Sequence, residues 1–198
     1  MVGFYYFPAD PSIFDTIQFY DQSYDPDGGG LSSESWDFGD GAGATGCCPT
    51  HRYPADGTYR LTLTVSTRDG RTASTSRDVL VRTHDVTVAS VTAPQTAGVG
   101  QTRAVTVGLT NGRYPETVQV VLLKSIAGGG WRLVGVLTQY VPVRVGDRTT
   151  DFNFEYTFVP EDGQLGNVSF QAIATIRGAR DAAPSDNEFT SLPTTVTS

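Results

Sequence analysis

Short runs of alternating apolar and polar residues, separated by turn dipeptides, make up most of this chain. In residues 59–65, for example, Tyr59, Leu61, Leu63 and Val65 alternate with polar side chains. A period of two puts every second side chain on the same face of a β-strand. Asp-Gly and Asn-Gly pairs, among 22 glycines and 11 prolines, stand between the runs as turn signals. The pattern predicts an all-β fold in which no helix is longer than a turn.

The alternation recurs often enough to outline a complete β architecture. Residues 118–123 carry apolar side chains on both faces, and such a strand is expected in the middle of a sheet. Other predicted strands lie at residues 16–19, 35–38, 78–81, 105–109, 152–158 and 168–176. Short strands separated by turns roughly every 8–12 residues indicate a β-sandwich or a small barrel.

The chain is long enough for two small domains, since it has 198 residues. One set of strands ends at Val81, and another begins at Asp85. The boundary is therefore predicted between residues 82 and 86. We expect one domain over residues 1–83 and a second over residues 84–198, each with its own hydrophobic core.

The charge balance excludes some partners. Asp and Glu number 21 against 14 Lys and Arg, which gives a net charge of −7. A nucleic-acid partner or an anionic membrane surface requires a basic patch, so neither is expected. No apolar run approaches the roughly 18 residues of a transmembrane helix. The N-terminus has neither a basic region nor a long apolar stretch, so it is not predicted to be a secretory signal peptide.

The predicted first domain carries three motifs in a distinctive order. Residues 23–28 read SYDPDG, residues 36–41 read WDFGDG, and residues 57–59 read GTY. Together they closely resemble the PKD (polycystic kidney disease) domain over residues 3–82. The resemblance implies an immunoglobulin-like β-sandwich, usually found in secreted or surface proteins, with no catalytic activity of its own.

Two aromatic residues suit such a sandwich. Trp36 stands where strand C of an immunoglobulin domain carries its core tryptophan, and Tyr59 stands where strand F carries a tyrosine corner. Leu61 occupies the position of the usual second cysteine, so aliphatic and aromatic packing replaces the disulfide. We expect Trp36, Tyr59 and Leu61 to be buried together with Phe19 and Leu63.

The predicted second domain has a weaker resemblance. Residues 85–88 (DVTV), 99–102 (VGQT) and 105–107 (VTV), which lead to Asn-Gly, resemble CARDB-like immunoglobulin-like modules of bacteria and archaea. The resemblance spans residues 85–197. It implies that the whole chain consists of two tandem immunoglobulin-like β-sandwich domains.

Three aspartates of the first domain are candidate metal ligands. Asp25 and Asp27 lie in the loop after the second strand of the sandwich, and Asp69 lies in the loop between its last two strands. Those loops meet at one end of an immunoglobulin-like sandwich, and carboxylate oxygens are the ligands that Ca²⁺ prefers. Some PKD domains bind calcium at this end, although Thr67 stands where the family often has another aspartate. The alternative is that the aspartates only cap tight turns.

Catalysis is not predicted. Asp37 and Asp40 form a pair of carboxylates, but they belong to the WDFGDG motif, where their role is structural. The two histidines, His51 and His84, have no evident nucleophile and acid around them. We therefore expect a protein that is not an enzyme.

Exposed aromatic residues are the candidate partner-binding sites. Residues 4–7 are four consecutive aromatics, yet only alternate residues of a strand can face its own core. Either Tyr5 and Phe7 or Phe4 and Tyr6 must therefore point outward, and we take Tyr5 and Phe7 as the candidate binding pair. Trp131 follows three glycines in a predicted hairpin tip, where a large ring is suited to insertion into a partner surface.

Three function classes fit these observations. The leading one is a non-catalytic structural or adhesion module, extracellular or on the cell surface, that makes protein–protein contacts in a larger assembly. One alternative is a structural or decoration protein of a virion or appendage. The other is a carbohydrate-binding accessory domain of a secreted hydrolase, which requires a planar row of exposed aromatic residues on one sheet face and would make glycans a partner.

Overall fold

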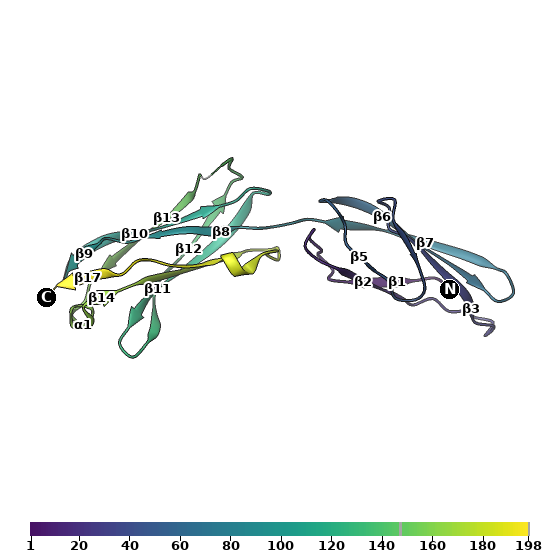
Figure 1. Ribbon diagram of the computed structural model, residues 1–198, viewed down its shortest axis with the longest axis horizontal. Coiled ribbons are helices and arrows are strands. Elements are labelled where there is room, and N and C mark those ends of the chain that lie inside the picture. The colour runs from purple at the N-terminus through teal and green to yellow at the C-terminus, as the bar shows by residue number, and fades with distance from the viewer. Residues whose placement is uncertain (147, 198) are drawn as a thin grey trace. The chain divides into compact units, whose positions relative to one another are not determined.

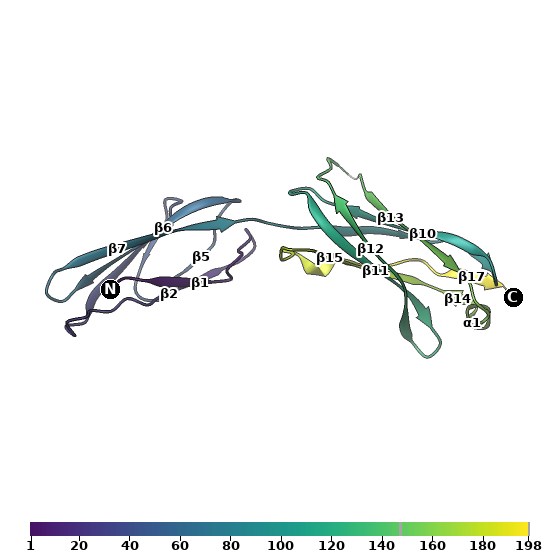
Figure 2. The ribbon, with the colours of Figure 1, turned by 180° about the vertical axis from the view of Figure 1, so that it is seen from behind.

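The computed structural model describes residues 1–146 and 148–197. The chain divides into two compact units, Met1–Thr83 and His84–Ser198. Both units are built almost wholly from β-strands, as Figures 1 and 2 show from opposite sides. The predicted all-β, sandwich-type fold class is confirmed.

Unit 1 is a sandwich of two antiparallel sheets. In chain order its strands are β1 (Phe4–Phe7), β2 (Ile17–Asp21), β3 (Leu31–Asp37), β4 (Gly43–Thr45), β5 (Thr50–His51), β6 (Gly57–Thr67) and β7 (Thr72–Val81). One sheet has the strand order β1-β2-β5, and the other has the order β4-β3-β6-β7. The apolar positions of the alternating runs line the space between these sheets.

The core of unit 1 contains four of the five residues that the sequence places there. The buried four are Phe19, Trp36, Leu61 and Leu63. Tyr59 is only half-buried, and its hydroxyl donates a hydrogen bond back to the carbonyl of Ala55 at 2.8 Å. That bond is the predicted tyrosine corner.

The WDFGDG motif forms the turn between β3 and β4. Asp37 Oδ1 accepts a hydrogen bond from the Gly39 N–H at 2.9 Å, and Asp40 Oδ1 accepts one from the Ala42 N–H at 3.0 Å. Asp40 Oδ2 also lies 2.7 Å from His51 Nε2. Both carboxylates therefore have partners that hold the turn, in agreement with the structural role expected for this motif.

The described residues of unit 2 form three sheets and a short helix. In chain order its elements are β8 (Thr87–Thr92), β9 (Thr96–Gly98), β10 (Thr102–Thr110), β11 (Glu116–Ile126), β12 (Gly130–Val141), β13 (Thr150–Thr157), α1 (Pro160–Leu165), β14 (Asn167–Val168), β15 (Phe170–Ile176), the 3₁₀ turn η1 (Pro184–Asp186), β16 (Glu188–Thr190) and β17 (Thr194–Thr197). The strand orders are β13-β10-β8, β12-β11-β15-β16 and β14-β17-β9. The first two sheets enclose the core of the unit.

The position of β11 agrees with its sequence. This strand lies between β12 and β15, so the prediction of a central strand at residues 118–123 is confirmed. Val118, Val120 and Leu122 face the core and are fully buried. The hairpin that joins β11 to β12 projects from the body of unit 2 in both Figure 1 and Figure 2.

Helix α1 corrects one expectation. Asp162-Gly163 was expected to be a turn between strands, but it lies inside this six-residue helix, which is longer than one turn. Pro160 is at the first helical position, where a missing N–H removes no hydrogen bond. Asp162 Oδ2 accepts a hydrogen bond from the Val159 N–H at 2.9 Å and so caps the helix start. No helix in the described residues has the length and apolar character needed to span a bilayer.

Candidate functional site

The outward side of β12 is largely apolar. This strand is an edge strand of its sheet. Four of its large side chains are exposed: Trp131, Leu133, Val136 and Tyr140. Leu133 is 58% exposed and Tyr140 is 64% exposed. Burial of these side chains by a partner would be favourable, because it removes apolar area from water.

A register shift in β12 decides which residues share this face. Leu133 pairs with Leu123 of β11, whereas Gly135 pairs with Leu122, which leaves Val134 as one extra residue on β12. One extra residue reverses the alternation of a strand. Odd-numbered residues therefore point outward before Val134, and even-numbered residues point outward after it.

The apolar surface continues onto the neighbouring strands. The register places Val136 beside Val121 of β11, and Val121 beside Ile173 of β15. Residues directly opposite each other on neighbouring strands lie within contact distance on one face. The resulting surface, which we call the β12 face, consists of Val121, Leu123, Trp131, Leu133, Val136, Tyr140 and Ile173.

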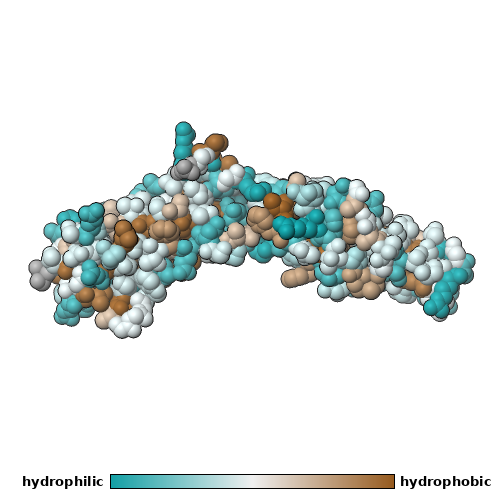
Figure 3. Space-filling model, in the orientation of Figure 1, coloured by the Kyte–Doolittle hydropathy of each residue, from teal (hydrophilic) through white to brown (hydrophobic). Residues whose placement is uncertain are grey.

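The β12 face has the properties of an interaction site. Contiguous exposed apolar patches on soluble domains commonly mark binding surfaces. Figure 3 shows, for the side of the molecule that it draws, separate hydrophobic patches within a mostly polar surface. Trp131 is 41% exposed and follows a turn in which Gly128 and Gly129 adopt φ of 85° and 81°. Such φ values strain any side chain, so glycine suits both positions.

The predicted outward pair of β1 is also exposed. Tyr5 is 46% exposed and Phe7 is 70% exposed, whereas Phe4 is buried in the core. Tyr5 is covered in part by Tyr20 of β2, whose ring is stacked on it at a centroid distance of 4.7 Å. Unit 1 therefore has a smaller aromatic surface of its own.

The three candidate metal ligands lie together, and a residue that the sequence did not point to lies between them. The guanidinium of Arg71 contacts Asp25 Oδ1 at 3.0 Å, Asp27 Oδ2 at 2.7 Å and Asp69 Oδ2 at 2.8 Å. Arg71 lies one residue before the start of β7, on the opposite side of the turn from Asp69. Its positive charge offsets much of the repulsion among the three carboxylates.

Hydrogen bonds already hold two of these carboxylates in place. The Asp25 side chain is 2% exposed, and its oxygens accept hydrogen bonds from the N–H groups of Asp27 and Gly29 at 3.2 and 2.9 Å. The pKa of Asp69 is lowered, first by the hydrogen bond from the Thr67 hydroxyl and then by Arg71. The three aspartates are thus brought together as the sequence predicts, and they also form the turns of the alternative interpretation.

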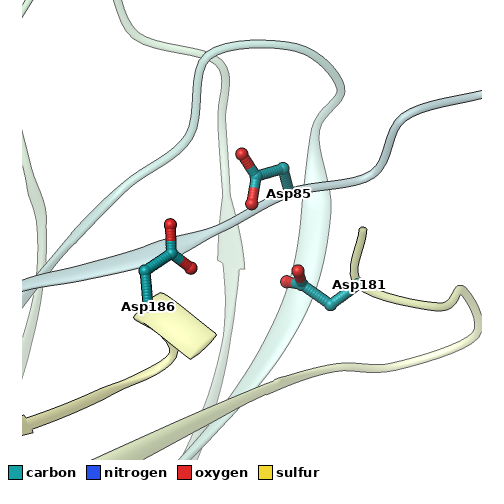
Figure 4. A group of neighbouring side chains, drawn as sticks. All are labelled: Asp85, Asp181 and Asp186. Atoms are coloured by element: carbon teal, nitrogen blue, oxygen red, sulfur yellow. The ribbon is translucent and has the colours of Figure 1, made fainter. Parts of the chain in front are cut away.

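A second acidic group occurs in unit 2. Oxygens of Asp85, Asp181 and Asp186 lie within 4.8 Å of one another. Figure 4 shows the three carboxylates pointing toward one another, Asp85 from the segment before β8 and the other two from the segment between β15 and β16. No sequence motif indicates that these three aspartates lie together.

The carboxylates of this second group differ in their partners. The oxygens of Asp181 accept hydrogen bonds from the N–H groups of Val86 and Ala183 at 3.3 and 2.8 Å, which anchors the segment before β8. One oxygen each of Asp85 and Asp186 is buried with no hydrogen-bond partner among the described residues. Burial and the neighbouring charges raise the pKa of Asp85. Oxygen ligands of this kind suit a hard divalent cation.

Known sequences place unit 1 in a family. Residues 10–81 match the profile of the PKD domain family. A microbial collagenase of Vibrio alginolyticus is 34% identical over 69 residues, which cover 35% of this chain but only 8% of the collagenase. The chain therefore spans less than a tenth of that relative. Residues 10–81 form a PKD domain, as their motifs indicate.

Solved structures similar to this chain include a PKD domain and a CARDB domain. The PKD1 domain of Vibrio anguillarum Epp is 29% identical, covers 41% of this chain and 92% of that chain, and superimposes with a TM-score of 0.38. A CARDB domain from Pyrococcus furiosus, solved in complex with di-metal ions, is 16% identical. It covers 59% of this chain and 90% of that chain, with a TM-score of 0.44.

Proposed function

We propose that this chain is a non-catalytic module of an extracellular or cell-surface protein and that it docks a protein partner through the β12 face. The PKD domain at residues 10–81 supports the first part of this proposal. The matched relative is a collagenase, and collagen is an extracellular protein. The virion alternative receives no support from these relatives.

The observation that carries the docking proposal is the continuity of the β12 face. Its side chains come from three adjacent strands, and their register places them side by side. The two rings, Trp131 and Tyr140, lie toward opposite ends of β12, and Leu133 and Val136 lie between them. Tryptophan and tyrosine are over-represented among the residues that contribute most to protein–protein binding.

We expect Trp131→Ala to weaken partner binding about tenfold or more, since truncation of a tryptophan that contributes strongly to an interface costs about 2 kcal/mol or more. Leu133→Ser should weaken it as well, because it places a hydroxyl in the apolar contact. Binding can be measured by co-sedimentation with insoluble collagen fibres, and self-association by sedimentation velocity. A photoreactive amino acid placed at position Thr138, and crosslinked in cells that produce the protein, extends the test to other partners.

Leu192→Ser is the matched control for this test. Leu192 is 87% exposed but lies outside the β12 face, so its substitution should leave binding unchanged. Circular dichroism of each variant verifies that the fold is intact. Equal binding by the wild-type chain and a folded Trp131→Ala variant would rule out docking through this face.

A glycan partner is the second candidate, and exposed aromatic rings favour it. Trp131 and Tyr140 share one sheet face, although aliphatic side chains separate them. Aromatic rings stack on the apolar faces of sugars, which is how such a row would bind a polysaccharide. Binding on a glycan array that is lost in Tyr140→Ala, together with no binding to protein probes, would favour this candidate.

Calcium binding by Asp25, Asp27 and Asp69 is a further proposal, and Arg71 makes it testable. The guanidinium lies where the three carboxylates converge, so we expect it to compete with a cation. Removing it in Arg71→Ala should leave the carboxylates without their counter-charge. Millimolar Ca²⁺ should then raise the Tm of the variant more than the Tm of the wild type, because a ligand that binds only the folded state stabilises it.

The double variant Arg71→Ala/Asp25→Asn is the control for calcium. It lacks both the competing cation and the most buried of the three carboxylates, so the response of Tm to Ca²⁺ should disappear. Equal responses of the single and double variants would show that calcium acts elsewhere and that these aspartates serve only their turns.

A further inference from the structure

The chain contains a single lysine, and this lysine is buried. Lys124 lies on β11 in the middle of its sheet and is only 3% exposed. Its ammonium lies 5.2 Å from the centre of the Tyr156 ring, and β15 pairs it with Phe170. Lysine is almost never fully buried unless its charge is paired, because water otherwise solvates that charge. The burial of this one therefore needs an explanation.

The partner of Lys124 is an equally buried carboxyl group. Lys124 Nζ donates a hydrogen bond to Asp162 Oδ1, and Asp162 is 1% exposed. The other oxygen, Asp162 Oδ2, accepts hydrogen bonds from the Tyr156 hydroxyl at 2.6 Å and from the Val159 N–H at 2.9 Å. The two oxygens of the carboxyl group thus have different surroundings: one faces an amine and the other faces two donors.

We propose that Lys124 and Asp162 join covalently, so that the mature protein contains an amide bond between Lys124 Nζ and Asp162 Cγ. This bond would form within the folded chain itself, without another enzyme. It would tie β11 to helix α1 across 38 residues of sequence. It goes beyond the docking function proposed above and does not depend on it.

The reaction balances without any other reagent. A proton first moves from the Nζ ammonium to Asp162 Oδ1 along their existing hydrogen bond, which leaves a neutral amine and a neutral carboxylic acid. The Nζ lone pair then attacks Cγ, and the C=O electron pair moves onto Oδ2. When the tetrahedral intermediate collapses, Oδ1 leaves as water and takes up the second proton that Nζ loses. The products are one amide and one water molecule.

Three features of the site favour this reaction. Burial favours a neutral amine and acid over two ions, and so assists the first proton transfer against the hydrogen bonds from Lys124 and Tyr156, which lower the pKa of Asp162 overall. The reacting groups are held together by the fold, and such proximity replaces the entropy loss of a bimolecular encounter. Oδ2, where negative charge develops, already has two hydrogen-bond donors in the arrangement of an oxyanion hole.

The surroundings of the site also fit. Tyr156 and Phe158, with ring centroids 5.1 Å apart, and Phe170, 5.4 Å from Tyr156, shield the pair on one side. On the other side, Lys124 and Asp162 border a cavity of about 370 Å³ that Glu161 and Arg132 also line. This cavity gives the released water a place to go.

The mass of the intact, purified chain tests the proposal directly. We expect it to be lower than the mass of the sequence by one water molecule. Because trypsin does not cleave after an acylated lysine, digestion should also yield one branched peptide that joins residues 114–132 to residues 149–177. After denaturation, an amine-reactive label should modify the N-terminal amine but not Lys124.

Matched variants locate the bond. Lys124→Arg keeps the charge but removes the primary amine, and Asp162→Ala removes the carboxyl group, so both should have the full mass of their sequences. Glu161→Gln alters the neighbouring, exposed carboxyl group and should retain the loss of water. A folded wild-type chain with the full mass of its sequence, and with Lys124 cleaved by trypsin, would show that the two residues form only an ion pair and would overturn the proposal.

Discussion

Replacing Trp36 with alanine is expected to lower the free energy of unfolding of unit 1 by about 3–5 kcal/mol, as other buried tryptophan truncations do. Trp36 is 2% exposed, and its ring lies 5.5 Å from Phe4 and 5.8 Å from Phe19. Its indole N–H also donates a hydrogen bond to the Gly46 carbonyl at 2.8 Å. Alanine would leave a cavity between the two sheets and an unsatisfied carbonyl beside β4.

The change in the free energy of unfolding can be measured by urea unfolding that is followed by hydrogen exchange of individual peptides. Peptides from unit 1 should lose protection at lower urea in the variant, while peptides from unit 2 act as an internal reference. Tyr24→Ala, which removes an aromatic ring that is 55% exposed, should cost much less. A loss below about 1 kcal/mol for Trp36→Ala would mean that this ring is not part of the core.

Asp162→Ala is expected to destabilise unit 2 by about 3–5 kcal/mol, the usual cost of removing one partner from a buried charge pair. The variant leaves the ammonium of Lys124 buried without a counter-charge. It also removes the acceptor for the Val159 N–H at the start of α1. The expectation holds whether the two residues are ionised or joined by an amide, because either form is lost.

The double variant Lys124→Met/Asp162→Ala is the informative companion. It contains no buried charge, and methionine has nearly the length of lysine without its ammonium. We therefore expect it to be more stable than Asp162→Ala alone, with a higher urea midpoint for unit 2. If the double variant were less stable than the single one, the cost of Asp162→Ala would have to arise from the helix start and not from the unpaired lysine.

The sequence predicts the fold class because the pattern that indicates a strand lies within the strand itself. Apolar positions at a period of two, interrupted by Asp-Gly pairs, leave little room for a helix, and residues 118–123 lie in a central strand as expected. The PKD motifs likewise identify residues 10–81. The sequence did not predict helix α1, because its Asp-Gly pair is typical of a turn. In the structure Pro160 occupies the first helical position, and the Asp162 side chain caps the helix start.

The β12 face shows what a regular pattern cannot predict. Strict alternation from Trp131 would place Gly135 and Leu137 outward. The extra residue Val134 instead reverses the alternation of inward and outward side chains, so Val136 and Tyr140 lie on the face. Gly135 turns toward the core, where a side chain would lie 3.2 Å from the ring of Phe154. A bulge depends on how two strands pair, and that pairing is not visible in either strand alone.

The sequence and the structure agree to different degrees on where the candidate residues lie. Tyr5 and Phe7 point outward because Phe4 on the same strand faces the core, and a period of two allows no other arrangement. The sequence also located Asp25, Asp27 and Asp69, since they sit in loops that an immunoglobulin-like sandwich brings together. It did not indicate Arg71, whose long side chain reaches all three from the position just before β7.

By itself, therefore, the sequence determined many of the strands, the sandwich class, the PKD domain and the fact that one aromatic pair of β1 must point outward. Those features follow from the period of a strand and from short motifs, which are local. The tertiary structure alone decided the β12 face, the contact of Arg71 with three carboxylates, and the meeting of Lys124 with Asp162 across 38 residues. These three depend on register and on long-range packing, which bring together residues that no local pattern relates.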